Sequence, residues 1–272
     1  MQPSLIAPLQ VRIEPVMPIT HLLLDIEGTT CPVQFVAEVL FPYARRNLKL
    51  FLERHGDEPE VTALVEAVHE AWQNDRDPGA QALLAASGSE LGDQAPARTR
   101  AAAVVPYLAW LIDHDIKATA LKDLQGRIWE AGYADGEIVA PLFEDVPNAL
   151  RRWHAEGLVL AVYSSGSVAA QQLLYGHSQA GDLRDLFSHW FDTRTGPKQE
   201  AASYRAIASA MGCSPAEVLF ISDSPAELRA ADAVGMVVLF SDRAGNPCRD
   251  SGSFERISDY GNLSINDDDD RS

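Results

Sequence analysis

Two acidic residues follow a short apolar run near the start of the chain. The run from Leu22 to Leu24 ends in Asp25, and Glu27 and Gly28 come soon after. A short, bounded apolar run predicts a buried strand, and Gly28 lets the backbone turn away after it. A carboxylate beside a buried strand is costly without a partner. The sequence therefore predicts that these acids meet a bound cation or a reacting substrate at the carboxyl end of a central strand.

A small polar turn follows the apolar run 158–163. It consists of Ser164, Ser165 and Gly166, and a helix is predicted to start just after it. Hydroxyl and backbone N–H groups at the start of a helix can bind phosphate oxygens. A serine that merely caps the helix is the common alternative. Because Asp25 is also present, we favour the interpretation as a phosphate-binding turn.

A lysine and a third acid complete the set of candidate site residues. Lys198 follows a Gly-Pro turn, and Asp223 ends the apolar run 218–222. A lysine can supply a point charge to a phosphate group. Asp223 can meet Asp25 around a hard cation, and Mg²⁺ prefers oxygen ligands and keeps several waters. The histidines show no metal-ligand spacing with one another or with cysteine, so zinc is not expected. The sequence predicts one Mg²⁺ per chain.

Two further residues near these acids need an interpretation. Glu227 lies four residues after Asp223, on the helix predicted to follow it. We expect Glu227 to support the metal ligands from behind, and an ordinary acid in the first turn of a helix is the alternative. Cys31 lies close to the first acids, but Asp25 fits the role of a nucleophile better.

The overall charge limits the classes of partner. Acidic residues outnumber basic ones 39 to 22, which gives a formal net charge of −17. Nucleic acids and anionic membranes need a basic surface, so neither is expected as a partner. The three cysteines are widely spaced, which predicts free thiols in a reducing compartment. No signal peptide or membrane span is recognised in the sequence, so we expect a cytoplasmic protein.

The elements that must position these residues alternate in the second half of the chain. Helices are predicted over 146–155, 168–174, 201–211 and 227–234. Strands are predicted over 19–25, 158–163, 189–191, 218–222 and 236–240. Alternating strands and helices predict a doubly wound parallel α/β sheet with helices on both faces. The polar groups that follow the strands should then meet at one edge of the sheet.

A block without any strand pattern separates the first strand from the others. Helices are predicted over 33–54, 60–72, 101–112 and 118–131, with a break or kink at Pro42. Residues 74–99 are expected to form a polar loop with a short helix at most. We interpret the block as an inserted helical cap that closes over the site and selects the substrate. Its candidate wall residues are Phe35, Phe41, Tyr43 and Trp129, although for each one taken singly burial in the core of the cap is favoured over contact with the substrate.

These elements predict four parts of the chain. The expected parts are a loose leader over 1–18, a catalytic core over 19–32 and 136–250, a helical cap over 33–135, and an acidic, disordered tail over 251–272. The aspartate run 267–270 is interpreted as a solvated charge run within this tail.

The order and types of the candidate residues resemble the haloacid dehalogenase superfamily of phosphotransferases. That superfamily has four motifs: an aspartate nucleophile, a serine or threonine, a lysine and an acidic metal ligand. Within it, several strings resemble the enolase-phosphatase E1 family over residues 19 to 245. The strings are DIEGTT at 25–30, FPYAR at 41–45, LQG at 124–126 with Trp129, YSSGSV at 163–168, LYGH at 174–177, FDT at 191–193 with GPK at 196–198, and FISD at 220–223.

The resemblance implies a bifunctional enolase-phosphatase of methionine salvage. Such an enzyme uses Mg²⁺ to enolise 2,3-diketo-5-methylthiopentyl-1-phosphate and then removes phosphate, which gives the acireductone 1,2-dihydroxy-3-keto-5-methylthiopentene. A superfamily phosphatase with another small phosphate monoester is the alternative. A non-catalytic protein with this fold is a third hypothesis, which the complete set of motif residues disfavours. The resemblance also implies a monomer.

The resemblance assigns roles to the candidate residues. Asp25 would attack phosphorus and form an aspartyl-phosphate. Ser164, Ser165, Gly166 and Lys198 would bind the phosphate, and Asp25, Glu27 and Asp223 would form the magnesium site. Glu27 stands where most superfamily phosphatases carry aspartate. Its role is open among protonation of the leaving oxygen, proton transfer during enolisation, and a backbone carbonyl given to the metal.

Overall fold

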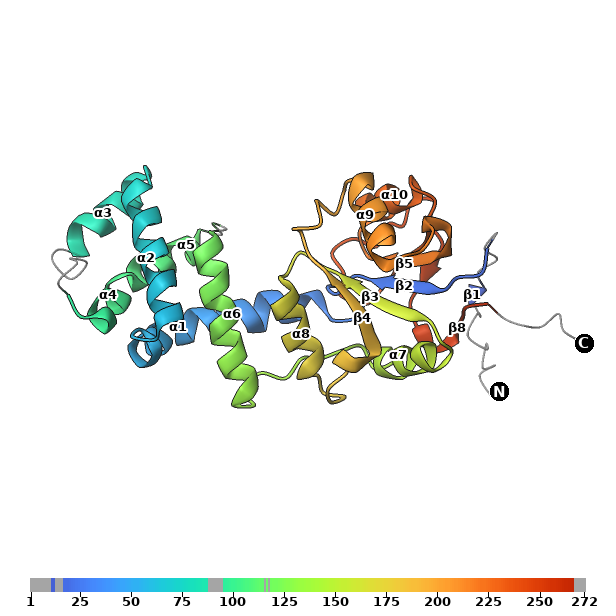
Figure 1. Cartoon of the computed structure of the whole chain (residues 1–272), viewed down its shortest axis with the longest axis horizontal. Helices are drawn as coiled ribbons and strands as arrows, with labels where there is room; N and C mark the ends of the chain where they lie inside the picture. Colours follow the sequence, from blue (N-terminus) through green and yellow to red (C-terminus); the bar gives the residue numbers. More distant parts are fainter. Residues whose placement is uncertain (1–10, 13–16, 88–94, 115, 117, 267–272) are drawn as a thin grey trace, which may run out of the picture. The chain divides into compact units, whose positions relative to one another are not determined.

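A computed structural model gives the structure of the chain, and it describes residues 11–12, 17–87, 95–114, 116 and 118–266 (Figure 1). The chain divides into two compact units. The core unit comprises Met1–Val36 and Val139–Ser272, and the helical unit comprises Ala37–Ile138. The inserted cap was predicted over 33–135, and both boundaries of the helical unit lie three or four residues later in the chain.

Six parallel strands form the main sheet of the core unit, in the order β4-β3-β2-β5-β6-β7. Their bounds are β2 His21–Leu24, β3 Val159–Tyr163, β4 Phe187–Phe191, β5 Val218–Ser222, β6 Val237–Ser241 and β7 Arg256–Ile257. The first of these strands, β2, lies between β3 and β5, and Leu24 pairs with Val162 on one side and Ile221 on the other. The predicted doubly wound parallel sheet is confirmed.

Helices cover both faces of this sheet, with α9 and α10 on one face and α7 and α8 on the other (Figure 1). Their bounds are α7 Val146–Ala155, α8 Val168–Gly176, α9 Ala201–Met211 and α10 Pro225–Asp232. Short 3₁₀ turns occupy Arg184–Leu186, Pro215–Glu217 and Tyr260–Asn262. One apolar cluster joins the strands to α9 and α10, and it includes Leu23, Phe220, Ile207 and Leu228. Burial of these side chains removes apolar surface from water and fixes the sheet against its helices.

The order of the strands determines where a site can form. The chain runs from β2 to β3 on one side and later returns to β5 on the other side, so the strand order reverses at β2. In doubly wound sheets, ligands bind in the crevice beyond the carboxyl ends of the strands at this reversal. Asp25 follows β2 directly, so the fold places its carboxylate at that position.

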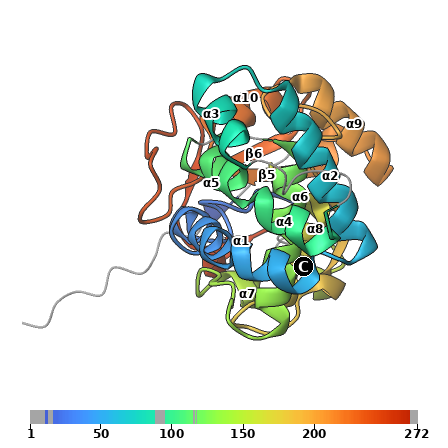
Figure 2. The same ribbon diagram turned by 90° about the vertical axis from the view of Figure 1, so that its left-hand side faces the viewer.

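The helical unit contains six α-helices in its described residues and no strand (Figure 2). Their bounds are α1 Phe41–His55, α2 Pro59–Asn74, α3 Pro78–Ser87, α4 Ala97–Ala103, α5 Val105–Asp113 and α6 Thr119–Ala134. A π-helix, Phe35–Leu40, leads into α1, and Pro42 lies in the first turn of α1. The helical conformation continues through Leu40 into α1, so the chain does not break at Pro42; the helix changes from π to α there, and proline is tolerated in the first turn of the new α-helix.

Two parts of the helical unit differ from the prediction. Residues 101–112 do not form one helix, because Pro106 starts a new one and α4 ends at Ala103. Residues 74–99 contain a ten-residue helix, α3, where we expected a short helix at most. Asp77 initiates α3 by accepting hydrogen bonds from the N–H groups of Gly79 and Ala80.

The predicted tail from residue 251 is wrong for the part that the structure describes. Residues 256–264 contribute β7 and a second small strand pair, in which β8 (Leu263–Ser264) pairs in parallel with β1 (Val11–Arg12). Tyr260 is fully buried, which holds this segment on the core. Within the predicted leader 1–18, Val11 and Arg12 likewise belong to a strand. The aspartate run 267–270 lies outside the described residues.

Candidate active site

Asp25 is held at the carboxyl end of β2 by its backbone and by its side chain. Its N–H donates to the Ile221 carbonyl of β5 at 3.0 Å, and the residue is buried. Its Oδ1 accepts the N–H of Ile26 at 2.7 Å, and its Oδ2 accepts the hydroxyl of Ser222 at 3.0 Å. A carboxylate with this many donors is fixed in direction, as a nucleophile or metal ligand must be.

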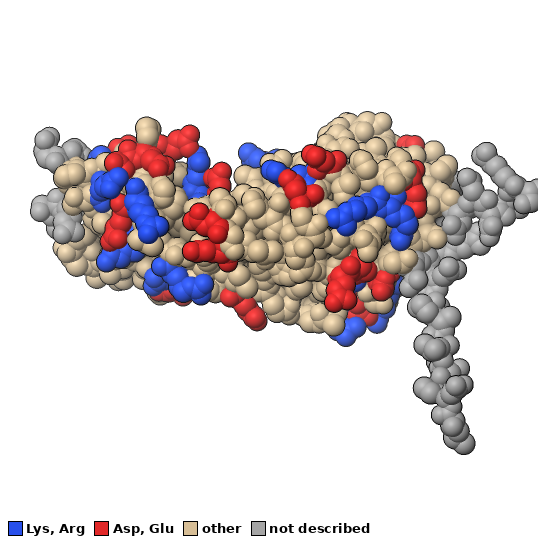
Figure 3. Space-filling view, turned by 90° about the horizontal axis from the view of Figure 1, so that it is seen from below, with Lys and Arg blue, Asp and Glu red and all other residues tan. Residues whose placement is uncertain are grey.

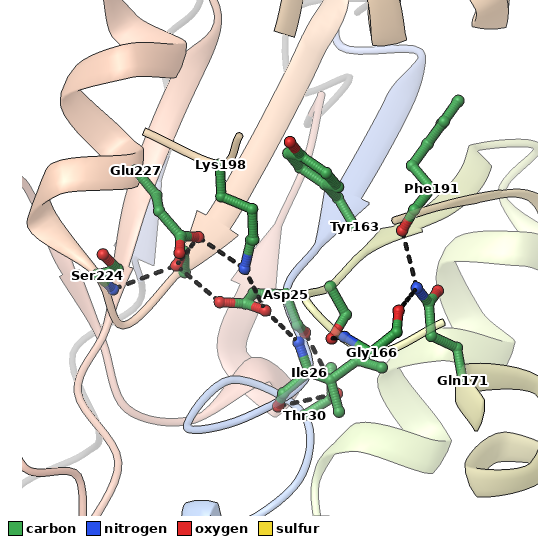
Figure 4. Close-up of polar contacts among 12 residues, drawn as sticks. Asp25, Ile26, Thr30, Tyr163, Gly166, Gln171, Phe191, Lys198, Ser224 and Glu227 are labelled. Atoms are coloured by element: carbon green, nitrogen blue, oxygen red, sulfur yellow. Dashed lines mark hydrogen bonds and ion pairs between the residues drawn. The ribbon is translucent and has the colours of Figure 1, made fainter. Parts of the chain in front are cut away.

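Lys198 lies between Asp25 and Glu227 (Figure 4). Its Nζ is 2.8 Å from Asp25 Oδ1 and 2.8 Å from Glu227 Oε2, and its side chain is only 11% exposed. The ammonium also lies 5.6 Å from the centre of the Tyr163 ring, within reach of a cation–π contact. Burial by itself would lower the pKa of Lys198, but the two carboxylates raise it above its ordinary value. Lys198 is therefore a fixed positive charge beside Asp25.

Three polar side chains of the core hold the turn that carries Lys198. Tyr163 donates its hydroxyl to the Gly196 carbonyl at 2.8 Å, and Tyr204 donates to the Lys198 carbonyl at 2.7 Å. Ser203 donates to the Pro197 carbonyl at 2.8 Å. Because the backbone around Lys198 is anchored in this way, its ammonium is positioned by the core rather than by a free loop.

Asp223 lies against the turn that follows Asp25. A Cβ placed on Gly28 would lie 2.2 Å from Asp223 Oδ2, so only glycine allows this approach. Gly28 also has a φ of +69°, in the left-handed region that favours glycine. Burial and the negative charge of Asp25 raise the pKa of Asp223 to about 7, with Lys198 opposing the shift and Glu27 adding to it. Negative charge is therefore concentrated between Asp25 and Asp223.

This concentration of oxygen donors and negative charge fits a hard divalent cation. Mg²⁺ is held by one or two carboxylates together with waters and substrate phosphate. Over the described residues, no three His, Cys, Asp or Glu side chains are arranged to hold a metal ion. A magnesium site here would therefore use the carboxylates of Asp25 and Asp223, with backbone and water oxygens completing it.

The turn 164–166 follows β3 beside Asp25, and Gln171 of α8 holds it by hydrogen bonds. Gln171 Nε2 donates to the carbonyls of Gly166 at 2.9 Å and Phe191 at 2.8 Å (Figure 4). Ser164 is buried, whereas Ser165 is exposed. The residue that caps α8 is Ser167, whose hydroxyl accepts the N–H of Ala170. The capping alternative therefore does not apply to Ser164 or Ser165, and both remain candidates for phosphate binding.

Glu227 and Ser222 have partners that the sequence analysis did not foresee. The carboxylate of Glu227 contacts Lys198 at 2.8 Å and accepts the hydroxyl of Ser222 at 3.2 Å. Ser222 also donates to Asp25, so the four side chains form a closed ring of contacts. Glu227 thus supports the lysine and not Asp223 directly. Burial and Asp25 raise the pKa of Glu227, while Lys198 opposes the shift.

Cys31 and the four candidate wall residues of the cap differ in how far their side chains are buried. Cys31 is buried, and burial together with the Glu27 charge raises the pKa of its thiol to about 12, so it is not an activated nucleophile. Phe35 is buried in the core unit, and Tyr43 is buried in the helical unit, where it donates to Glu137. Phe41 is 42% exposed and packs edge-on against Trp129 at 5.9 Å. Phe41 is therefore the exposed ring among the four candidate wall residues.

The class of the chain follows from its fold, its site and its match to a known family. A family model described as haloacid dehalogenase-like hydrolase matches residues 19–235. The chain therefore belongs to this family of hydrolases, and the resemblance found in the motifs is confirmed. Over the described residues, no helix has both the length and the apolar composition to cross a membrane.

Individual relatives narrow the assignment. The chain is 51% identical to a Synechococcus elongatus protein named Enolase-phosphatase E1, over 90% of this chain and 98% of that protein. It is 50% identical to a protein of the same name from another Synechococcus strain, over 84% of this chain and 91% of the relative. The crystal structure of the Saccharomyces cerevisiae UTR4 protein superimposes with a TM-score of 0.70 at 31% identity, covering 89% of this chain and 98% of that one. The chain belongs to the enolase-phosphatase E1 family.

Proposed function

We propose that the chain enolises 2,3-diketo-5-methylthiopentyl-1-phosphate and then removes its phosphate, which gives the acireductone 1,2-dihydroxy-3-keto-5-methylthiopentene in methionine salvage. Its relatives named Enolase-phosphatase E1 support this activity. The observation that carries the proposal is the pairing of Asp25 with Lys198 at the carboxyl end of β2, with Asp223 beside the same turn. These are the groups that a phosphoryl transfer through an aspartate requires.

The proposed dephosphorylation has two steps at Asp25. A carboxylate oxygen of Asp25 attacks phosphorus, an O–P bond forms, and the bond from phosphorus to the substrate oxygen breaks. Water then cleaves the aspartyl-phosphate and restores the carboxylate. Lys198 and the N–H groups of the turn 164–166 stabilise negative charge on the phosphoryl oxygens. We assign to the Glu27 side chain the proton that the leaving oxygen takes up.

Magnesium is the proposed cofactor, with one ion per chain. When bound between Asp25 and Asp223, it would neutralise charge on the substrate oxygens. The same residues would serve an ordinary phosphate monoester, so the enolase step is the part that distinguishes the proposed function from that of another superfamily phosphatase.

Product analysis with the diketo phosphate tests the proposed function. The expected result is ultraviolet absorbance of the enol followed by release of inorganic phosphate, with both signals lost in the presence of a chelator. A panel of other small phosphate monoesters is run alongside. Turnover of a panel member in preference to the diketo phosphate, or phosphate release without an enol, would favour the alternative phosphatase.

Gly28→Ala is expected to weaken Mg²⁺ binding and turnover. A Cβ at residue 28 would collide with Asp223 Oδ2 at 2.2 Å and would also require a strained left-handed backbone. Gly212→Ala is the matched control, since Gly212 has a φ of +74° and nothing within 4 Å of an added Cβ. Gly212→Ala should lose about 1–2 kcal/mol of stability from backbone strain. Gly28→Ala should lose more, because the collision with Asp223 adds to the same strain. Thermal unfolding and a Mg²⁺ titration should show that only Gly28→Ala loses metal affinity. Equal metal affinity in both would contradict the proposed place of Asp223.

The proposed partners and location follow from charge and cysteine use. Acidic and basic side chains are interspersed on the face shown in Figure 3, which offers no continuous basic surface there. With the net charge of −17, this supports a small phosphate ester as partner and not a nucleic acid or a membrane. All three cysteines are free thiols, in keeping with a reducing cytoplasm. We propose a cytoplasmic monomer.

A further inference from the structure

Three side chains from the last part of the core unit hold the backbone of the turn after Asp25. Ser241 Oγ and Asn246 Nδ2 each donate to the Gly28 carbonyl at 2.9 Å. Tyr260 donates its hydroxyl to the Thr29 carbonyl at 3.0 Å. Ser241 and Tyr260 are fully buried, and Asn246 is 7% exposed. Ser241, Asn246 and Tyr260 are called the carbonyl clamp below.

The shape of the turn explains why these carbonyls need partners from elsewhere. The Ile26 carbonyl accepts the N–H groups of Thr29, Thr30 and Cys31, which closes the turn tightly. The Gly28 and Thr29 carbonyls do not join that set, and both residues are buried. A buried carbonyl without a hydrogen-bond donor costs free energy. The clamp residues supply donors to the Gly28 and Thr29 carbonyls, which find none within the turn.

The clamp also acts on the place where Asp223 meets the turn. A Cβ on Gly28 would lie 2.9 Å from Asn246 Nδ2 and 2.2 Å from Asp223 Oδ2, so both side chains lie against the same glycine. The orientation of the Asn246 amide is fixed, because its nitrogen also donates to the Ser241 carbonyl at 3.2 Å. Any movement of Gly28 away from Asn246 would therefore change the space that Asp223 occupies.

The ring and the backbone of Tyr260 are both held by contacts with neighbouring residues, so its hydroxyl can hold the turn in a fixed position. The guanidinium of Arg243 lies 4.1 Å from the centre of the Tyr260 ring and makes two hydrogen bonds to Asp145, at 2.9 and 2.8 Å. Asp145 also accepts the N–H of Tyr260 at 2.6 Å. The ring of Tyr260 is thus held from its face and its backbone, and its hydroxyl has little freedom to leave Thr29.

We propose that the carbonyl clamp positions the turn 26–30 for Mg²⁺ binding and thereby sets the affinity of the site formed by Asp25 and Asp223. Its three members are positioning residues that act through the backbone of Gly28 and Thr29. The proposal rests on the proposed function for the metal, and it assigns a role to the segment 241–260, to which the sequence analysis gave none.

The test uses Asn246→Ala and Tyr260→Phe in the full chain. Tyr107→Phe in the helical unit is the control, because Tyr107 is also a buried tyrosine whose hydroxyl donates a hydrogen bond, in its case to Asp75 at 2.8 Å. Mg²⁺ affinity is measured by titration calorimetry, and the exchange of the amide hydrogens of residues 28–31 is measured without metal. Each clamp variant should bind Mg²⁺ about 10-fold more weakly, the scale on which groups behind metal ligands act. Exchange at residues 29–31 should be faster in both variants.

The outcomes separate the clamp from the proposed function and from a purely structural role. Weaker Mg²⁺ binding and faster exchange in both folded variants, with Tyr107→Phe unchanged, support the clamp. Lower thermal stability with unchanged Mg²⁺ affinity and unchanged exchange would overturn it. Neither readout uses turnover, so the clamp can be upheld even if wild-type protein fails to convert the diketo phosphate, a result that would overturn the proposed function alone.

Discussion

Asp25→Asn is expected to abolish phosphate release, with a loss of about 10⁴-fold or more, as is typical when a nucleophile is removed. The asparagine amide has almost the same shape as the carboxylate, but it cannot form the aspartyl-phosphate. Its carbonyl oxygen can still accept the N–H of Ile26 and the ammonium of Lys198. Because enolisation does not need a bond between residue 25 and phosphorus, part of the enol signal should remain.

The measurement follows both products of Asp25→Asn with the diketo phosphate, as ultraviolet absorbance of the enol and as inorganic phosphate. Asp182→Asn is the control, since Asp182 is an acid paired with Arg184 on the surface of the core unit. It should match wild type in both signals. Phosphate release by Asp25→Asn at the wild-type rate would refute Asp25 as the nucleophile. If phosphate release persists while the enol signal is lost, residue 25 acts in the enolisation step and not in the phosphoryl transfer.

The strands and helices that carry the site could be predicted where local pattern and packing agree. The helices 146–155 and 201–211 and the strand 218–222 have the bounds expected from their periodicity. The segment after residue 251 could not be predicted, because β7 and β8 are only two residues long and have no period. Its order depends on the burial of Tyr260 against distant residues, which a local pattern does not contain.

The candidate site residues could be predicted because charged side chains at the ends of buried strands cost free energy unless a bound cation or a substrate compensates their charge. This cost identifies Asp25 and Asp223 as site residues, but it does not determine which partner each side chain takes. Ser222 was missed as a partner of Asp25, since a serine at the last position of an apolar strand is not unusual by itself. The one available signal was a polar residue at the end of the otherwise apolar run 218–222.

Lys198→Met is expected to lower both turnover and stability, for different reasons. Methionine has a similar length but no charge, so the phosphoryl oxygens lose a cationic partner, and turnover should fall by about 10²–10³-fold. The substitution also leaves Asp25 and Glu227 in a buried site without the ammonium that lay 2.8 Å from each. Removing one partner from a buried ion pair costs about 3–5 kcal/mol. Thermal unfolding and phosphate release measure the two effects.

A second substitution separates these effects. Adding Glu227→Gln to Lys198→Met removes one uncompensated carboxylate, so stability should recover in part while turnover stays low. The recovery should grow as the pH rises from 5 to 8. The folded-state pKa of Glu227 is raised from its ordinary value of 4.5 to about 7, and removing Lys198 raises it further, so the cost of this carboxyl to the fold begins above pH 4.5 and grows until the pH passes the folded-state pKa. At pH 5 the carboxyl is largely protonated in the folded protein, and the double variant should gain little. Recovery of turnover together with stability would show that Lys198 serves the fold alone and does not act on the phosphate.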